Sequence, residues 1–185
     1  MTFGSFNKLG KVSDETVALW AQVLGAVPRS RLFLKSKALA EEATRALTIA
    51  RFAKHGVTPE RLTLFGWVPE DAGHLATYSR IDIALDTFPY SGTTTTCEAL
   101  WMGVPVLTLA GATHASRVSA SLLTSIGLTD WICETPGTFV TRALLTANAT
   151  DLAALRAELR ERVASSPLCD GASYAAAVEA AYRAM

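Results

Sequence analysis

The residue types best suited to chemistry gather in residues 92–98, where four threonines and a glutamate follow a glycine. We expect a helix to begin here. A helix start offers unpaired backbone N–H groups and the positive end of the helix dipole, and both attract phosphate. Thr95 and Glu98 also fit a T-x-x-E capping box, which by itself explains both side chains. Residue types alone leave an anion site and a capped helix start equally open.

Other candidate ligand-binding side chains follow predicted strands. Lys8 and Lys11 come just after the first strand, and lysine is a good point-charge partner for phosphate. By spacing alone, a solvated surface loop is the simpler explanation of both lysines. His74 lies near the start of a short helix. It could hydrogen-bond a phosphate or a base of a ligand, and the alternative is a histidine that only packs at the surface. Arg117 either pairs with an anion or braces its loop, and bracing is the simpler role. Glu98 has a second role open to it, because an acid beyond a phosphate loop can accept hydrogen bonds from ribose hydroxyls.

The elements that must position these residues are short apolar strands that alternate with helices. The predicted strands are residues 2–6, 31–35, 62–65, 81–85, 104–109 and 130–132. The predicted helices are one capped by Ser13, residues 37–55, residues 73–78, the threonine run to Gly103, residues 116–126 and two or three alanine-rich helices at the end. This alternation predicts an α/β fold, a Rossmann-like parallel sheet with helices on both faces. Ligands bind at the carboxyl ends of such strands, so we expect the site in the loops after residues 6, 65, 85 and 109.

Composition excludes several classes of function. The 185 residues suit one α/β domain, with half of them hydrophobic and 18% charged. Lysine plus arginine equals aspartate plus glutamate, 17 each, which argues against bulk electrostatic binding of nucleic acid. No apolar run is long enough to span a membrane. Three cysteines spaced 36 residues apart fit no zinc pattern, so we expect no metal site and a cytoplasmic protein with free thiols.

Two common phosphate loops are missing from the sequence. No G-x-G-x-x-G follows the first strand, and no G-x-x-x-x-G-K-[ST] occurs. These absences argue against a dinucleotide oxidoreductase and a P-loop NTPase.

Read together, the motifs resemble the carboxyl-terminal half of the catalytic region of O-linked N-acetylglucosamine transferases. The resemblance includes the SPINDLY-like relatives with tetratricopeptide repeats, and we expect a bacterial type. It is carried by F-N-K-L-G-K at 6–11, Pro69 with His74, and residues 85–90, 92–106 and 115–121, in matching order over nearly the whole chain. It implies the carboxyl-terminal lobe of a GT-B glycosyltransferase. Such an enzyme transfers N-acetylglucosamine from UDP-N-acetylglucosamine to protein serine and threonine hydroxyls, with inversion and without a required metal or cofactor.

The resemblance also implies roles for particular residues. Lys11 matches the lysine that stabilises the diphosphate leaving group, and we take it as the catalytic residue. Glu98 matches the acid that binds ribose, and His74 matches a histidine that packs beside the uracil. Val68 stands where a backbone group reads the base edge. The donor-binding residues implied in this way are Lys8, Lys11, Val68, His74, Thr93, Thr94, Thr95 and Glu98.

Some positions depart from the family pattern. Thr93 replaces a histidine of the animal enzymes, and Glu70 and Thr77 stand where those enzymes have basic residues near the nucleotide. These losses of positive groups leave the donor open. The alternatives are another GT-B enzyme, such as a GDP-fucose transferase or an epimerase, or a non-catalytic nucleotide-binding module.

The resemblance also concerns the extent of the chain. We expect residues 1–185 to form a single nucleotide-sugar-binding domain, without the amino-terminal lobe and the tetratricopeptide repeats. The protein acceptor would be reached through that missing lobe and the repeats. We therefore expect this polypeptide to fold alone and to show little or no transfer by itself.

Overall fold

The structure is a computed structural model of the chain and describes residues 1–66 and 71–185. A six-stranded sheet has the order β3-β2-β1-β4-β5-β6, and each of its strand pairs is parallel. The strands are β1 Thr2–Ser5, β2 Arg31–Lys35, β3 Leu62–Phe65, β4 Ile83–Leu85, β5 Val106–Leu109 and β6 Ile132–Cys133. From β1 the chain adds β2 and β3 on one side of the sheet, and then β4, β5 and β6 on the other side. The boundary between β1 and β4 is therefore the topological switch point, where ligands bind in open parallel sheets.

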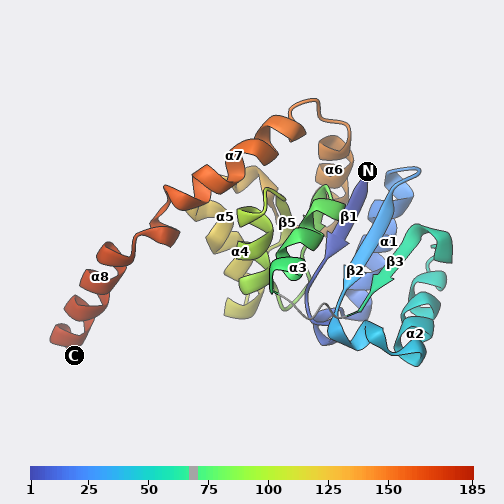
Figure 1. Cartoon of the computed structure of the whole chain (residues 1–185), viewed down its shortest axis with the longest axis horizontal. Helices are drawn as coiled ribbons and strands as arrows, with labels where there is room; N and C mark the ends of the chain where they lie inside the picture. The colour runs from blue at the N-terminus through green and yellow to red at the C-terminus, as the bar shows by residue number, and fades with distance from the viewer. Residues whose placement is uncertain (67–70) are drawn as a thin grey trace.

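Helices cover both faces of this sheet (Figure 1). Helix α1 packs against α2 and α6 on one face, while α4 packs against α5 and α7 on the other. The helices are α1 Asp14–Ala26, α2 Glu42–Ala53, α3 Asp71–Ala76, α4 Thr94–Trp101, α5 Val118–Ser125, α6 Pro136–Ala147, α7 Leu152–Ala164 and α8 Gly171–Ala184. The predicted α/β fold is therefore confirmed, including the parallel sheet between two helical layers.

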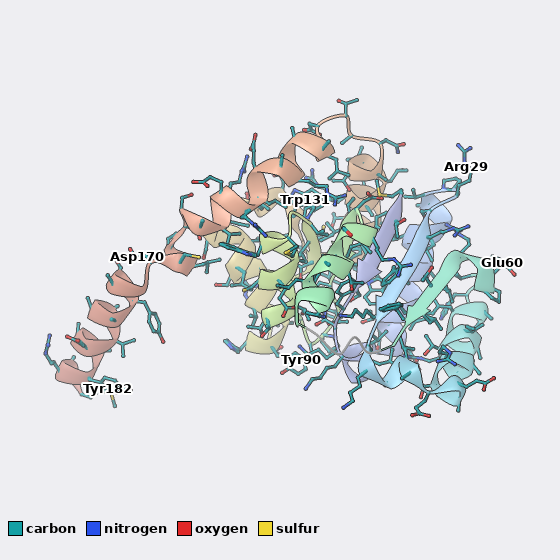
Figure 2. The ribbon with its side chains drawn as sticks, viewed as in Figure 1. Arg29, Glu60, Tyr90, Trp131, Asp170 and Tyr182 are labelled. Carbon is teal, nitrogen blue, oxygen red and sulfur yellow. The ribbon has the colours of Figure 1, made fainter. Side chains whose placement is uncertain are left out.

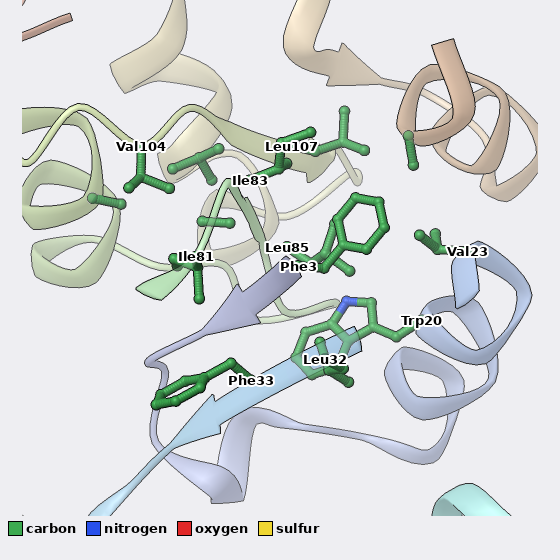
Figure 3. Packing of buried hydrophobic residues seen from close by; sticks show 14 of the residues in the cluster. Phe3, Trp20, Val23, Leu32, Phe33, Ile81, Ile83, Leu85, Val104 and Leu107 are labelled. Atoms are coloured by element: carbon green, nitrogen blue, oxygen red, sulfur yellow. The ribbon is translucent and has the colours of Figure 1, made fainter. Parts of the chain in front are cut away.

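The core between the sheet and α1 is centred on Trp20, which is fully buried with Phe3 and Leu32 (Figure 3). The indole Nε1 of Trp20 donates to the backbone oxygen of Asp86 at 3.3 Å. The predicted cap at Ser13 is confirmed, since its hydroxyl accepts from the backbone N–H of Thr16 at 3.1 Å. The Ser13 and Thr16 hydroxyls also donate to the backbone oxygen of Phe88, so the core and the start of α1 fix the segment that follows β4.

Two predicted elements differ from those observed. Residues 37–55 do not form one helix, because Glu41 is extended (φ −80°, ψ 129°) and separates a 3-10 turn at Lys37–Ala40 from α2. The strand predicted at 130–132 is mostly a 3-10 turn at Thr129–Trp131, and β6 follows it. In this turn the Trp131 N–H bonds to Leu128 O instead of to a neighbouring strand.

The carboxyl-terminal helix α8 extends away from the rest of the molecule (Figures 1 and 2). None of its residues is buried, and Tyr182 is 74% exposed. No helix within the described ranges is both long enough and apolar enough to cross a membrane.

Candidate functional site

A cleft of about 670 Å³ lies where the carboxyl ends of β1 and β4 meet the start of α4. Seven of the eight donor-binding residues predicted from the sequence line it: Lys8, Lys11, His74, Thr93, Thr94, Thr95 and Glu98. Val68 lies outside the described residues. The structure therefore brings the predicted side chains together, while their roles toward a ligand stay predictions.

Lys11 presents a positive charge to this cleft. Its ammonium donates to Ser91 O at 2.9 Å and lies 3.8 Å from the centre of the Tyr90 ring. Partial burial lowers the pKa of Lys11, and so does Lys8, while the buried carboxylate of Asp86 opposes this shift. An ammonium has three hydrogens, so two remain for an anionic ligand beyond the bond to Ser91.

The start of α4 is not closed by the predicted capping box, and that prediction is wrong. Thr93 is the N-cap residue and makes no side-chain cap bond. The Thr95 hydroxyl instead donates to Asn7 Oδ1 at 2.9 Å, and Glu98 Oε2 accepts from His74 Nε2 at 2.9 Å. The Thr95 hydroxyl and the Glu98 carboxylate, which a capping box would use, are therefore bonded to side chains from distant segments. Within the described part of the chain, the backbone N–H groups of Thr94 and Thr95 carry no hydrogen bond, so they are open to an anion.

A buried carboxylate, Asp86, lies next to the cleft and accepts hydrogen bonds from the segments around it. Asp86 Oδ1 accepts from the backbone N–H groups of Thr87 at 2.9 Å and Gly92 at 2.8 Å. Asp86 Oδ2 accepts from the Thr108 hydroxyl at 2.8 Å, and Asn7 Nδ2 lies 3.4 Å from Oδ1. Burial raises the pKa of Asp86, and the hydrogen bonds oppose that shift. Sequence reasoning missed this role of Asp86, although an acid directly after an apolar strand was a visible signal.

A second polar cluster closes the other side of the cleft and joins Lys35, His74, Tyr78 and Glu98. Lys35 ends β2 and is only 6% exposed, and its ammonium contacts His74 Nδ1. The Tyr78 hydroxyl lies 3.0 Å from Glu98 Oε2. Burial raises the pKa of Tyr78, and the negative charge of Glu98 raises it further. Sequence reasoning missed Lys35 and Tyr78, and the available signal was a lysine at the end of an apolar strand.

Two further expectations concern Arg117 and metals. Arg117 Nη1 donates to Gly111 O at 3.2 Å, so the bracing role is confirmed. In the described residues, no three His, Cys, Asp or Glu side chains gather closely enough to hold a metal ion.

Residues 1–178 of this chain match the sequence model of glycosyl transferase family 41. The chain belongs to glycosyl transferase family 41. Among the curated relatives of this chain, the probable UDP-N-acetylglucosamine–peptide N-acetylglucosaminyltransferase SPINDLY of Oryza sativa subsp. japonica is 44% identical over 186 residues. That alignment covers 100% of this chain and 20% of the rice protein. The chain therefore spans about a fifth of the length of the curated relatives it matches.

A solved structure of a similar protein agrees with the fold. A mutant of the Thermobaculum terrenum O-GlcNAc transferase superposes with a TM-score of 0.92 and 43% identity, over 98% of this chain and 35% of that one. The expected carboxyl-terminal lobe of a GT-B fold is thereby confirmed. The S. aureus TarM structure, at a TM-score of 0.66 and 12% identity, shares the fold alone.

The plant relatives do not bear out one finer expectation. SPINDLY proteins from rice, Solanum lycopersicum and other plants match at 41–44% identity over the whole chain. This similarity to plant proteins argues against the predicted bacterial type.

Proposed function

We propose that this chain is the donor-binding lobe of a family 41 glycosyltransferase and that it binds UDP-N-acetylglucosamine. The observation that carries the proposal is one cleft at the switch point of the sheet, lined by Lys11, the open start of α4 and Glu98. Its first two features suit a diphosphate, and its carboxylate suits the ribose hydroxyls. The plant relatives are named as probable UDP-N-acetylglucosamine–peptide N-acetylglucosaminyltransferases, which supports the same donor.

The proposed reaction transfers N-acetylglucosamine with inversion to serine or threonine hydroxyls of a protein acceptor. As the glycosyl–phosphate bond breaks, negative charge grows on the diphosphate. The Lys11 ammonium and the N–H groups of Thr94 and Thr95 would stabilise that charge more strongly in the transition state than in the ground state. Because these groups supply the positive charge, the proposal requires no metal or other cofactor.

The remaining parts of the proposal concern the whole protein. The acceptor would bind mainly outside this chain, which spans about a fifth of its curated relatives. The balanced charge supports a protein acceptor over nucleic acid. A cytoplasmic location is supported by Cys97, Cys133 and Cys169, which are all free thiols.

Calorimetric titration of the chain with UDP, GDP, UDP-N-acetylglucosamine and pyrophosphate tests the proposed donor. We expect UDP and UDP-N-acetylglucosamine to bind more tightly than GDP and pyrophosphate. A folded sample that binds none of them would overturn the proposal, and tighter binding of GDP would replace the donor with a GDP-sugar.

Substitution of Glu98 tests the ribose end of the cleft. Glu98 Oε2 is occupied by His74 and Tyr78, while Oε1 has no hydrogen bond to the described residues. We expect Glu98→Gln to weaken UDP binding about tenfold, because a bond to a charged group is worth about 1.5–3 kcal/mol. Pyrophosphate has no ribose, so its affinity should change less than about twofold, and titration of both ligands measures the difference.

The matched control for this variant is Glu158→Gln, which removes an exposed carboxylate of α7 that pairs with Arg162. It should change neither affinity. An equal loss of UDP and pyrophosphate affinity in Glu98→Gln would contradict the ribose role and indicate a general disturbance of α4.

A further inference from the structure

Lys35 is a buried cation that the proposed chemistry does not use directly. It follows three buried apolar residues at the end of β2, and it is not among the residues that line the cleft. Burial lowers the pKa of Lys35, while the charge of Glu98 opposes that shift. Burying an ammonium costs free energy that burying an apolar side chain of similar size does not cost. Stability therefore does not explain why a lysine stands here.

The contacts of Lys35 fix which nitrogen of His74 carries the hydrogen. An ammonium only donates, so His74 Nδ1, which faces Lys35, has to accept. The ring hydrogen then lies on Nε2, which donates to Glu98 Oε2 at 2.9 Å. Three elements are linked in this way, because Lys35 ends β2, His74 is in α3 and Glu98 is in α4.

The same chain of bonds sets the direction of the Glu98 carboxylate. Oε2 receives both His74 Nε2 and the Tyr78 hydroxyl, at 2.9 and 3.0 Å. An ionised carboxylate accepts at both oxygens, so Oε1 remains for a ligand.

We propose that Lys35 is a positioning residue for ribose recognition. It holds the His74 ring with its hydrogen on Nε2, and through His74 it orients the Glu98 carboxylate so that Oε1 is free for a vicinal diol. This inference rests on the proposed function, since the diol is the ribose of the donor. Lys35 acts through His74 and does not touch the nucleotide.

The first test measures the His74 ring in the ligand-free chain by nitrogen NMR near neutral pH. Only His55, His74 and His114 contribute, and His74→Gln identifies the signal of His74. We expect Nε2 to be protonated and Nδ1 bare in the wild type, and a mixture of both forms in Lys35→Met. A wild-type ring with hydrogen on Nδ1, or an unchanged pattern in Lys35→Met, would overturn the inference.

The second test compares UDP with pyrophosphate by titration. Lys35→Met should weaken UDP binding about tenfold and pyrophosphate binding less than about twofold, because only the Glu98 end is disturbed. Its thermal melting temperature should be no lower than that of the wild type, which excludes a folding defect. Lys54→Met, at an exposed lysine after α2, is the control and should alter nothing.

The outcomes separate this inference from the proposed function. A wild-type chain that fails to bind UDP overturns the proposed donor, and the NMR pattern then decides the role of Lys35 toward His74 by itself. A wild type that binds UDP while Lys35→Met binds it equally well overturns the role of Lys35 alone.

Discussion

Replacing Lys11 by methionine is expected to weaken the binding of UDP to this chain by roughly 10- to 150-fold, the equivalent of one charge-assisted hydrogen bond. Lys11 lines the proposed phosphate end of the cleft. Its ammonium is held in place by Ser91 O at 2.9 Å and by the Tyr90 ring. Methionine keeps a straight apolar stem against Tyr90 and removes only the charge and its hydrogen bonds. Affinity should therefore fall without loss of stability.

The loss for Lys11→Met should extend to pyrophosphate, because the lysine is expected to contact the diphosphate. This separates it from Glu98→Gln and Lys35→Met, whose effects should be confined to UDP. In the whole enzyme the transfer rate should fall by about 10²–10³, as for the loss of one donor that stabilises a developing charge.

Lys8→Met is the matched control for Lys11→Met. Lys8 lines the same cleft but is exposed, so solvent screens its charge and we expect less than about a fivefold loss of UDP affinity. Calorimetric titration of both variants and both ligands makes the comparison. An unchanged affinity in Lys11→Met, or a larger loss in Lys8→Met, would remove Lys11 from the diphosphate site.

The location of the site could be predicted from the sequence because a parallel sheet gathers the ends of its strands at one edge. Lys11 follows β1 and the threonine run follows β4, so the alternation of strands and helices was sufficient to bring them together. The strand order, with β1 beside β4, then placed them at the switch point.

The hydrogen-bond partners within the site could not be predicted, because they depend on contacts between distant segments. A local pattern suggested that Thr95 and Glu98 bond each other's backbone. In the structure Thr95 bonds Asn7, 88 residues away, and Glu98 bonds His74, 24 residues away. Lys35 was missed for the same reason, since a lysine at a strand end is ordinarily exposed and its burial depends on α3 packing over it.

The largest expected loss of stability comes from Asp86→Ala, which should lower the free energy of unfolding by about 3–5 kcal/mol. The Asp86 carboxylate is buried, with its oxygens facing the backbone N–H groups of Thr87 and Gly92 and the Thr108 hydroxyl. Alanine would leave these buried donors without an acceptor, and each unsatisfied group costs about 1–3 kcal/mol. Denaturation in urea, monitored by circular dichroism, measures the difference from the wild type.

The matched variant Asp86→Asn separates the hydrogen bonds of Asp86 from its charge. Its amide oxygen can still accept from Thr87 and Gly92, and its NH₂ can donate to the Thr108 hydroxyl, which also accepts. We therefore expect a loss below about 1 kcal/mol, or a gain, because a buried charge disappears. If Asp86→Asn were as unstable as Asp86→Ala, the charge would be the stabilising feature and our account would be wrong.

The charge of Asp86 should show itself in the pH dependence of stability. Burial raises the pKa of Asp86 in the folded chain above its unfolded value of 3.8, so the folded state binds the proton more tightly. Stability from this group is then present below the unfolded pKa and is lost as pH rises through the folded pKa. The Asp86→Asn variant should lack that loss. The pH profiles of stability of the wild type and of Asp86→Asn should therefore diverge between the unfolded and the folded pKa of Asp86. The ionised form of Asp86 thus costs stability, while its negative charge opposes the lowering of the Lys11 pKa. This buried charge near the cleft therefore helps keep Lys11 cationic for the proposed diphosphate.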